Sequence, residues 1–179
     1  MRIVAVVLLV LIPLAAFGQP MPAESRDAIH TLLNNHEKLT RTVTLTDDGY
    51  VAVTESNDPE LAKVLRAHIA QMEARLKEGL MVRRWDPAFV EVVAHFDQME
   101  TRMEPTEKGL KMTVKGKTPE AVKVAQNHAG IVTDFVNSGW DGHNREHKMV
   151  LESSSVSGST GCCGGGCGGG RGHGHRGGR

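Results

Sequence analysis

The stretch that decides the fold is HEKLTRTVTLTDDGYVAVTESNDPELAKVLRAHIAQMEARLKEG, residues 36–79, because its pattern recurs about sixty positions further along the chain. His36 corresponds to His95 at an offset of 59, so one residue was gained or lost before the first strand. Turns and helix starts demand glycine and proline, whereas folding does not demand that imidazoles recur. A buried metal or cofactor site is therefore the leading hypothesis. At an offset of 60 the matches are Gly49 with Gly109, Pro59 with Pro119, Glu60 with Glu120, Val64 with Val124, His68 with His128, and Gly79 with Gly139.

Within the first copy, two short runs alternate between β-branched or apolar residues and polar ones. Val43 and Leu45 lie before the turn Asp47-Asp48-Gly49, and Val51 and Val53 lie after it. Two such runs joined by an Asp-Gly turn predict a β-hairpin.

Apolar residues at helical spacing flank this hairpin on both sides. One helix is predicted over Glu24–Thr40, with His36 on its apolar stripe. Asn57-Asp58-Pro59-Glu60 starts a second helix, since it combines a capping side chain, a proline and an acid in the first turn. The stripe of that helix carries His68, and Met72 follows one turn later.

The second copy predicts the same order of elements. Asp86-Pro87 starts a helix that carries Phe89 to Met99, with His95 beside its stripe. A hairpin is predicted around Glu107-Lys108-Gly109. Thr118-Pro119-Glu120 starts the last long helix, which carries His128 and ends at Ser138-Gly139.

Two tandem helix-hairpin-helix repeats, over about residues 24–80 and 85–140, predict an α+β fold. We expect four helices and a four-stranded antiparallel sheet related by a pseudo-two-fold axis. The two-repeat domain is expected to occupy residues 19–151.

Both ends of the chain differ in composition from this domain. Arg2 precedes an apolar run over Ile3–Phe17, with small residues before Gln19, which predicts a signal peptide over residues 1–18. We therefore expect a periplasmic or secreted protein with no stable membrane anchor after cleavage. Residues 152–179 are nearly all Ser, Gly, Cys, His and Arg, a composition that predicts a disordered tail.

Charge and motif content narrow the function classes. The 21 basic and 21 acidic residues give no net charge, and no helix or face concentrates the basic ones, which argues against a nucleic-acid partner. No set of acid, base and nucleophile can be assembled, so no enzyme activity is predicted.

The recurring histidines predict an exported metal-binding protein, with copper as the expected metal and storage, delivery or tolerance as the expected role. Imidazole combined with thioether donors favours copper over zinc. Two alternatives stay open: bis-histidine ligation of a b-type haem, and an envelope interaction domain whose histidines are hydrogen-bonded core residues. One shared site or two separate sites are both compatible with the spacing. The proposed ligands are His36, His68, His95, His128, Met72 and Met99.

Two further groups are candidates for secondary metal binding. His143, Glu146 and His147 match a zinc-peptidase motif, but the surrounding stretch is polar and lacks an apolar helix. We therefore interpret the two histidines as an accessory pair. The tail offers a loose set of thiols and imidazoles: Cys162, Cys163, Cys167, His173 and His175.

The pattern also resembles a group of small exported bacterial proteins with a duplicated helix-hairpin-helix unit, for which no activity is established. The resemblance covers about residues 29–139 and rests on His36, the first hairpin, Asn57-Asp58-Pro59, His68 with Met72, Trp85-Asp86-Pro87, and the second pair His95 and His128. It implies the repeat and the export, and it implies no function.

Overall fold

The computed structural model describes residues 20–151, so the predicted signal peptide and the Cys/His-rich tail lie outside the described residues. Within this part, no helix has both the length and the apolar character needed to cross a bilayer. The elements in chain order are α1 (Ala23–Asn34), the 3₁₀ helix η1 (His36–Lys38), β1 (Leu39–Thr46), β2 (Gly49–Ser56), α2 (Pro59–Lys77), α3 (Pro87–Ala94), the 3₁₀ helix η2 (Phe96–Gln98), β3 (Met99–Pro105), β4 (Gly109–Gly116), α4 (Pro119–Ser138) and α5 (Trp140–His143).

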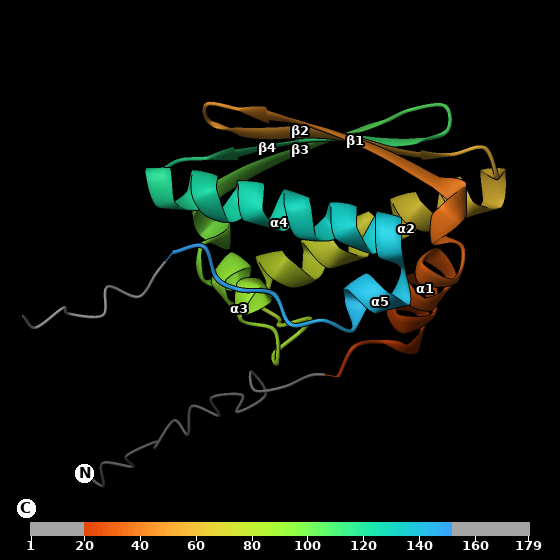
Figure 1. Cartoon of the computed structure of the whole chain (residues 1–179), viewed down its shortest axis with the longest axis horizontal. Coiled ribbons are helices and arrows are strands. Elements are labelled where there is room, and N and C mark those ends of the chain that lie inside the picture. The colour runs from red at the N-terminus through yellow and green to blue at the C-terminus, as the bar shows by residue number, and fades with distance from the viewer. Residues whose placement is uncertain (1–19, 152–179) are drawn as a thin grey trace, which may run out of the picture.

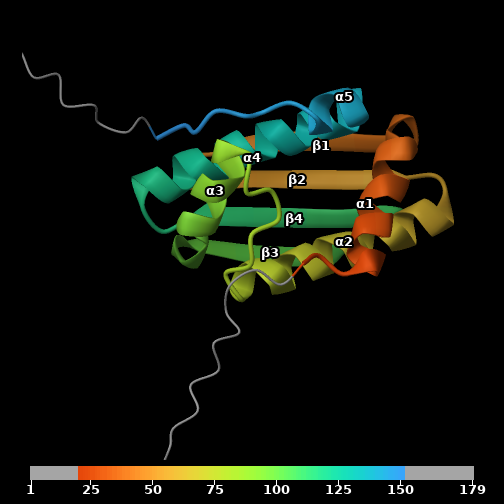
Figure 2. The same cartoon turned by 90° about the horizontal axis from the view of Figure 1, so that it is seen from below.

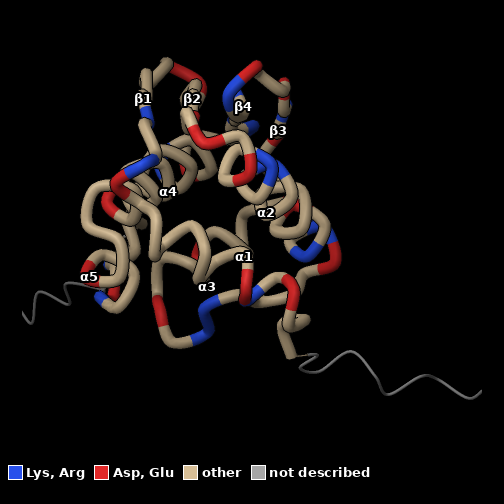
Figure 3. Tube along the Cα trace, turned by 90° about the vertical axis from the view of Figure 1, so that its right-hand side faces the viewer, with Lys and Arg blue, Asp and Glu red and all other residues tan. Residues whose placement is uncertain are grey.

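The four strands form one antiparallel sheet in the order β1-β2-β4-β3. All the helices lie on one side of it (Figure 1). Helices α2 and α4 pack directly beneath the sheet, and α1, α3 and α5 form a further layer below them (Figure 3). The predicted α+β class and the four-stranded antiparallel sheet are confirmed.

The starts of the three helices that begin with proline follow from local chemistry. The Asp58 carboxylate accepts hydrogen bonds from the backbone N–H groups of Glu60 and Leu61 at the start of α2. Asp86 accepts one from Ala88 at the start of α3, and the Thr118 hydroxyl accepts one from Ala121 at the start of α4. Each cap satisfies an N–H group that the helix itself cannot pair. The predicted start positions are confirmed.

Strands β2 and β4 form the centre of the sheet, and a glycine lies at each end of their pairing. Ala52 is paired with Met112 at the middle of this ladder. A Cβ on Gly49 would lie 1.9 Å from the carbonyl oxygen of Val114, and a Cβ on Gly109 would lie 2.1 Å from that of Thr54. Both distances are far below van der Waals contact, so each end of the central ladder requires a residue without a side chain.

Two apolar clusters join the layers. One lies between the sheet and α4, and the other lies between α1 and α2. The first consists of Tyr50, Ala52, Val114, Ala125 and Ala129, and the second of Leu32, Leu61 and Leu65.

Three sequence-based expectations about helices are wrong. The described residues contain five α-helices rather than four. The first helix ends at Asn34 rather than Thr40, so His36 lies in η1. The third ends at Ala94, which makes His95 its C-terminal cap and places Met99 at the start of β3. Beyond the ends of α1 and α3, the 3₁₀ helices or the first strand residues also carry apolar side chains. Their positions happen to match helical spacing, which made both helices look longer than they are.

Replacing Gly49 or Gly109 by alanine should disrupt the central strand pair, since the new methyl group would overlap a backbone carbonyl. We expect a loss of at least about 2 kcal/mol in the free energy of unfolding, measured by urea denaturation. Gly130→Ala is the matched control, because Gly130 lies in α4 with open space around it. That change should stabilise the protein by up to about 1 kcal/mol through helix propensity. Equal effects of all three substitutions would contradict the packing described for β2 and β4.

Candidate functional site

A cavity of about 490 Å³ lies between the sheet and the helices. Seen from below, α2 and α4 run along the sheet while α1 and α3 lie toward opposite ends of its strands (Figure 2). The cavity is partly open to the outside, and its lining is mostly aliphatic and aromatic, with Leu33, Ile69, Val93, Val132 and Phe135 among the contributors. This size and character fall in the range of small-molecule and cofactor sites.

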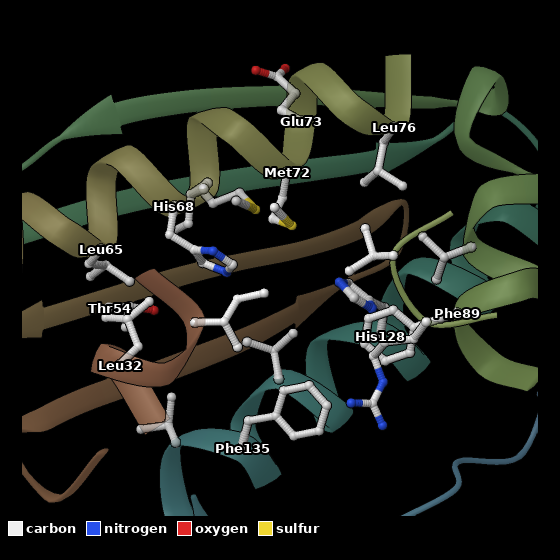
Figure 4. A pocket seen from close by; sticks show the side chains of 18 of the residues that line it. Leu32, Thr54, Leu65, His68, Met72, Glu73, Leu76, Phe89, His128 and Phe135 are labelled. Atoms are coloured by element: carbon white, nitrogen blue, oxygen red, sulfur yellow. The ribbon is translucent and has the colours of Figure 1, made fainter. Parts of the chain in front are cut away.

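Two of the predicted histidines point into this cavity from different helices. His68 projects from α2, and His128 projects from α4 (Figure 4). The Nδ1 atom of each ring is buried and has no hydrogen-bond partner in the described part of the protein. His128 also packs edge-on against Phe89, with ring centroids 5.3 Å apart. Because an unpaired polar atom in a core costs about 1–3 kcal/mol, these two rings are arranged at a cost to stability.

Burial keeps both of these imidazoles neutral. It lowers the pKa of His68 to about 4. Burial also lowers the pKa of His128 to about 4, with a further lowering by the charge of Arg41 that outweighs the opposite effect of Asp86. By surface area both residues are only half-buried, but both line the cavity, so part of their accessible surface is cavity wall. A neutral imidazole retains a lone pair, which is the form that binds a metal.

The other two predicted histidines behave differently. His36 lines the cavity, but its Nδ1 donates to the carbonyl oxygen of Val136 at 3.0 Å, since that oxygen only accepts. Its ring lies against Gly139, where a Cβ would come within 2.4 Å. His95 is not among the residues that line the cavity, and its buried Nδ1 has no hydrogen-bond partner within residues 20–151. The structure therefore brings His36, His68 and His128 to one cavity and leaves His95 outside it.

Both predicted methionines line the same cavity. Met72 lies one turn after His68 on α2, and both side chains line the cavity (Figure 4). Met99 reaches the cavity from β3 rather than from a helix. Within residues 20–151, no group of three or more His, Cys, Asp or Glu side chains is arranged to hold a metal ion.

A buried polar cluster holds residues 143–151, the C-terminal segment of the described chain, against the start of α3. Asp86 is fully buried and accepts hydrogen bonds from Arg83 at 3.0 Å and from Nδ1 of His147 at 2.8 Å. Arg83 also donates to the carbonyl oxygens of His143 and Arg145. Burial alone would raise the pKa of Asp86, but the hydrogen bonds from His147 and Arg83 outweigh it and lower the pKa.

The same segment is held at its end by Glu91, a buried carboxylate on α3. Its two oxygens accept hydrogen bonds from the backbone N–H groups of Val150 and Leu151, each at 2.9 Å. Since α5 ends at His143, the accessory pair His143 and His147 does not lie on one helix. The Nδ1 atom of His147 donates a hydrogen bond to Asp86. The tail candidates Cys162, Cys163, Cys167, His173 and His175 lie outside the described residues.

Sequence reasoning missed Arg41, which lines the cavity from β1. Leu39, Arg41 and Val43 alternate with exposed threonines along the strand, so all three face the helices. Side chains alternate between the two faces of a strand, so Arg41 shares the buried face with Leu39 and Val43. This pattern was already visible in the sequence.

Comparisons with protein-family models, with curated proteins and with solved structures found no match to this chain.

Changing Asp86 to Asn should destabilise the protein by about 3 kcal/mol or more, because Arg83 would keep its charge in a buried position without a carboxylate. The control is Asp134→Asn, which breaks the more exposed ion pair with Arg145 and should cost less than about 1 kcal/mol. Urea denaturation measures both. Comparable losses in the two variants would mean that the buried cluster does not anchor the C-terminal segment.

Stability should depend on pH between about 4 and 6.5 through His68 and His128. Their folded-state pKa values lie below the ordinary 6.5, so the unfolded chain binds their protons more tightly. The contribution is complete above pH 6.5 and is lost as the pH falls toward 4, by about 3 kcal/mol for each histidine. Denaturation of the ligand-free protein across this range tests the sign. The double variant His68→Gln/His128→Gln should lose most of the slope, and an unchanged slope would refute the assignment.

Proposed function

We propose that this protein is an exported, non-catalytic carrier of a b-type haem, held in the interior cavity with His68 and His128 as its two axial ligands. The observation that carries the proposal is the pair of neutral, unpartnered imidazoles that enter one large apolar cavity from two helices. Their Nδ1 atoms have no partner among the described residues. The Nδ1 of His95 has none either, but only His68 and His128 also line the cavity.

The size of the cavity favours a ligand with a large apolar body over a bare metal ion. Core cavities cost about 24 cal/mol per Å³, so 490 Å³ would cost at most about 12 kcal/mol if the space were closed and dry. That is comparable to the whole stability of a typical domain, about 5–15 kcal/mol. A metal ion and its donor atoms would leave most of this space empty, whereas a flat macrocycle would fill it.

We also propose that the domain is a duplicated helix-hairpin-helix unit with a pseudo-two-fold axis. The register of the central ladder supports this. The 60-residue offset converts the pair Gly49–Lys115 into Gly109–Glu55, and Ala52 is paired with Met112, its own equivalent at that offset. An axis between Ala52 and Met112 would relate α2 to α4 and hence His68 to His128. Two imidazoles related in this way would approach a centre on the axis from opposite sides, as axial ligation requires.

A copper ion is the second candidate, and Met72 is the observation that favours it. Met72 follows His68 by one turn of α2, and both residues line the cavity (Figure 4). Imidazole and thioether together suit Cu(I). The copper site predicted from the sequence would then shrink to His68, Met72 and His128, because His36 is hydrogen-bonded to a carbonyl and His95 lies outside the cavity.

Titration of ferric haem into the purified protein tests the proposal. We expect one haem per chain and the absorption spectrum of a six-coordinate, low-spin iron. His68→Ala and His128→Ala should each abolish six-coordination and raise the Kd at least about tenfold, which corresponds to about 1.4 kcal/mol.

The matched control is His95→Ala, which removes an equally recurrent histidine that does not line the cavity. It should leave the spectrum and the Kd unchanged. Haem binding that persists unaltered in the His68→Ala/His128→Ala double variant would refute the proposal. If the protein binds one Cu(I) per chain and does not bind haem, the copper candidate is favoured.

A further inference from the structure

The cavity contains one charged group that its apolar character does not explain. The Arg41 guanidinium projects from β1 into the space between the sheet and α4. There it donates hydrogen bonds to the hydroxyls of Thr54 at 2.7 Å and Thr133 at 3.3 Å. Burial lowers the pKa of Arg41 from its ordinary value, which reflects the cost of holding a cation there.

Arg41 differs from the other charged residues that line the cavity. Arg83 is paired with Asp86, and Glu73 is paired with Lys77. Arg26 is exposed to solvent. Arg41 alone among them is enclosed and forms no salt bridge within residues 20–151. The hydroxyls of Thr54 and Thr133 occupy two of its five donors. These hydroxyls and the neighbouring Tyr50 are neutral, so none of them balances the charge of the guanidinium.

The two hairpins also contribute different polar groups to the cavity lining. Arg41 is paired with Thr54 across β1 and β2, and the corresponding register position in the other hairpin pairs Thr101 with Val114. All four residues line the cavity. One end of the space therefore presents a cation and a hydroxyl, and the other presents a hydroxyl and an aliphatic side chain. A ligand that matches this lining has an apolar body and a single anionic end.

We propose that Arg41 binds a carboxylate of the ligand, so that the protein selects amphipathic carboxylic acids over neutral molecules of the same shape. The inference rests on the proposed function in taking the cavity as the ligand site. A guanidinium binds a carboxylate through two parallel hydrogen bonds, which gives both charge pairing and orientation. Arg41 lies close enough to His128 for its charge to affect that ring, so a ligand held by His128 would occupy the same part of the cavity as Arg41.

The experiment compares ferric haem with its dimethyl ester, in which both carboxylates are neutral. Wild-type protein should bind the free acid about tenfold more tightly than the ester. Arg41→Gln should remove this preference while leaving the axial-ligand spectrum intact, and Arg41→Lys should keep part of it. Arg84→Gln is the control, since Arg84 is exposed and does not line the cavity.

Thermal unfolding of the ligand-free variants separates recognition from a structural role. Removing an uncompensated buried charge should leave the unfolding temperature of Arg41→Gln unchanged or higher. A structural arginine would instead lower it and weaken acid and ester binding equally. An acid preference that survives in Arg41→Gln would overturn the inference.

Failure of the haem proposal is distinguishable from failure of this one. If wild-type protein binds neither haem nor its ester, tetradecanoate and tetradecanol are compared by their displacement of an apolar dye from the cavity. A preference for the carboxylate that Arg41→Gln abolishes would support the role of Arg41 without haem. Binding of neither compound, or a preference independent of Arg41, would overturn it.

Discussion

The antiparallel pairing of β2 with β4 is the constraint on which the rest of the structure depends. Glycine at each end of this ladder lets the two hairpins join into one sheet, with Ala52 opposite Met112 at its centre. Helices α2 and α4 follow these strands directly, so the pairing fixes where both helices lie beneath the sheet. The positions of His68 and His128 depend on that placement, since each ring is carried by one of the two helices.

The helix caps and hairpin turns were predictable because each depends on a few adjacent residues. Asp58, Asp86 and Thr118, each followed by proline, start helices where the sequence placed them. The C-terminal ends of α1 and α3 were not predictable, since neither ends at a glycine and apolar residues continue at helical spacing beyond them. His36, His95 and Met99 were therefore assigned to helices that end before reaching them.

The cavity itself could not be read from the sequence, because it depends on the lateral separation of helices rather than on any residue pattern. Recurrence identified His68 and His128, whose rings face the cavity, but it identified His36 and His95 equally. The structure separates them in two ways: a main-chain carbonyl accepts a hydrogen bond from His36, and His95 does not line the cavity. The cluster of Asp86 with Arg83 and His147 joins residues about sixty positions apart and left no local signal.

The most direct measurement of the central claim is a proton NMR spectrum of the ferrous, haem-loaded protein, which is diamagnetic when both axial positions hold imidazole. Ring protons of axial imidazoles lie above the macrocycle and shift strongly upfield. We expect this shift for both His68 and His128 and for no other histidine. Upfield shifts at His36 or His95, or at neither of the two predicted rings, would contradict it.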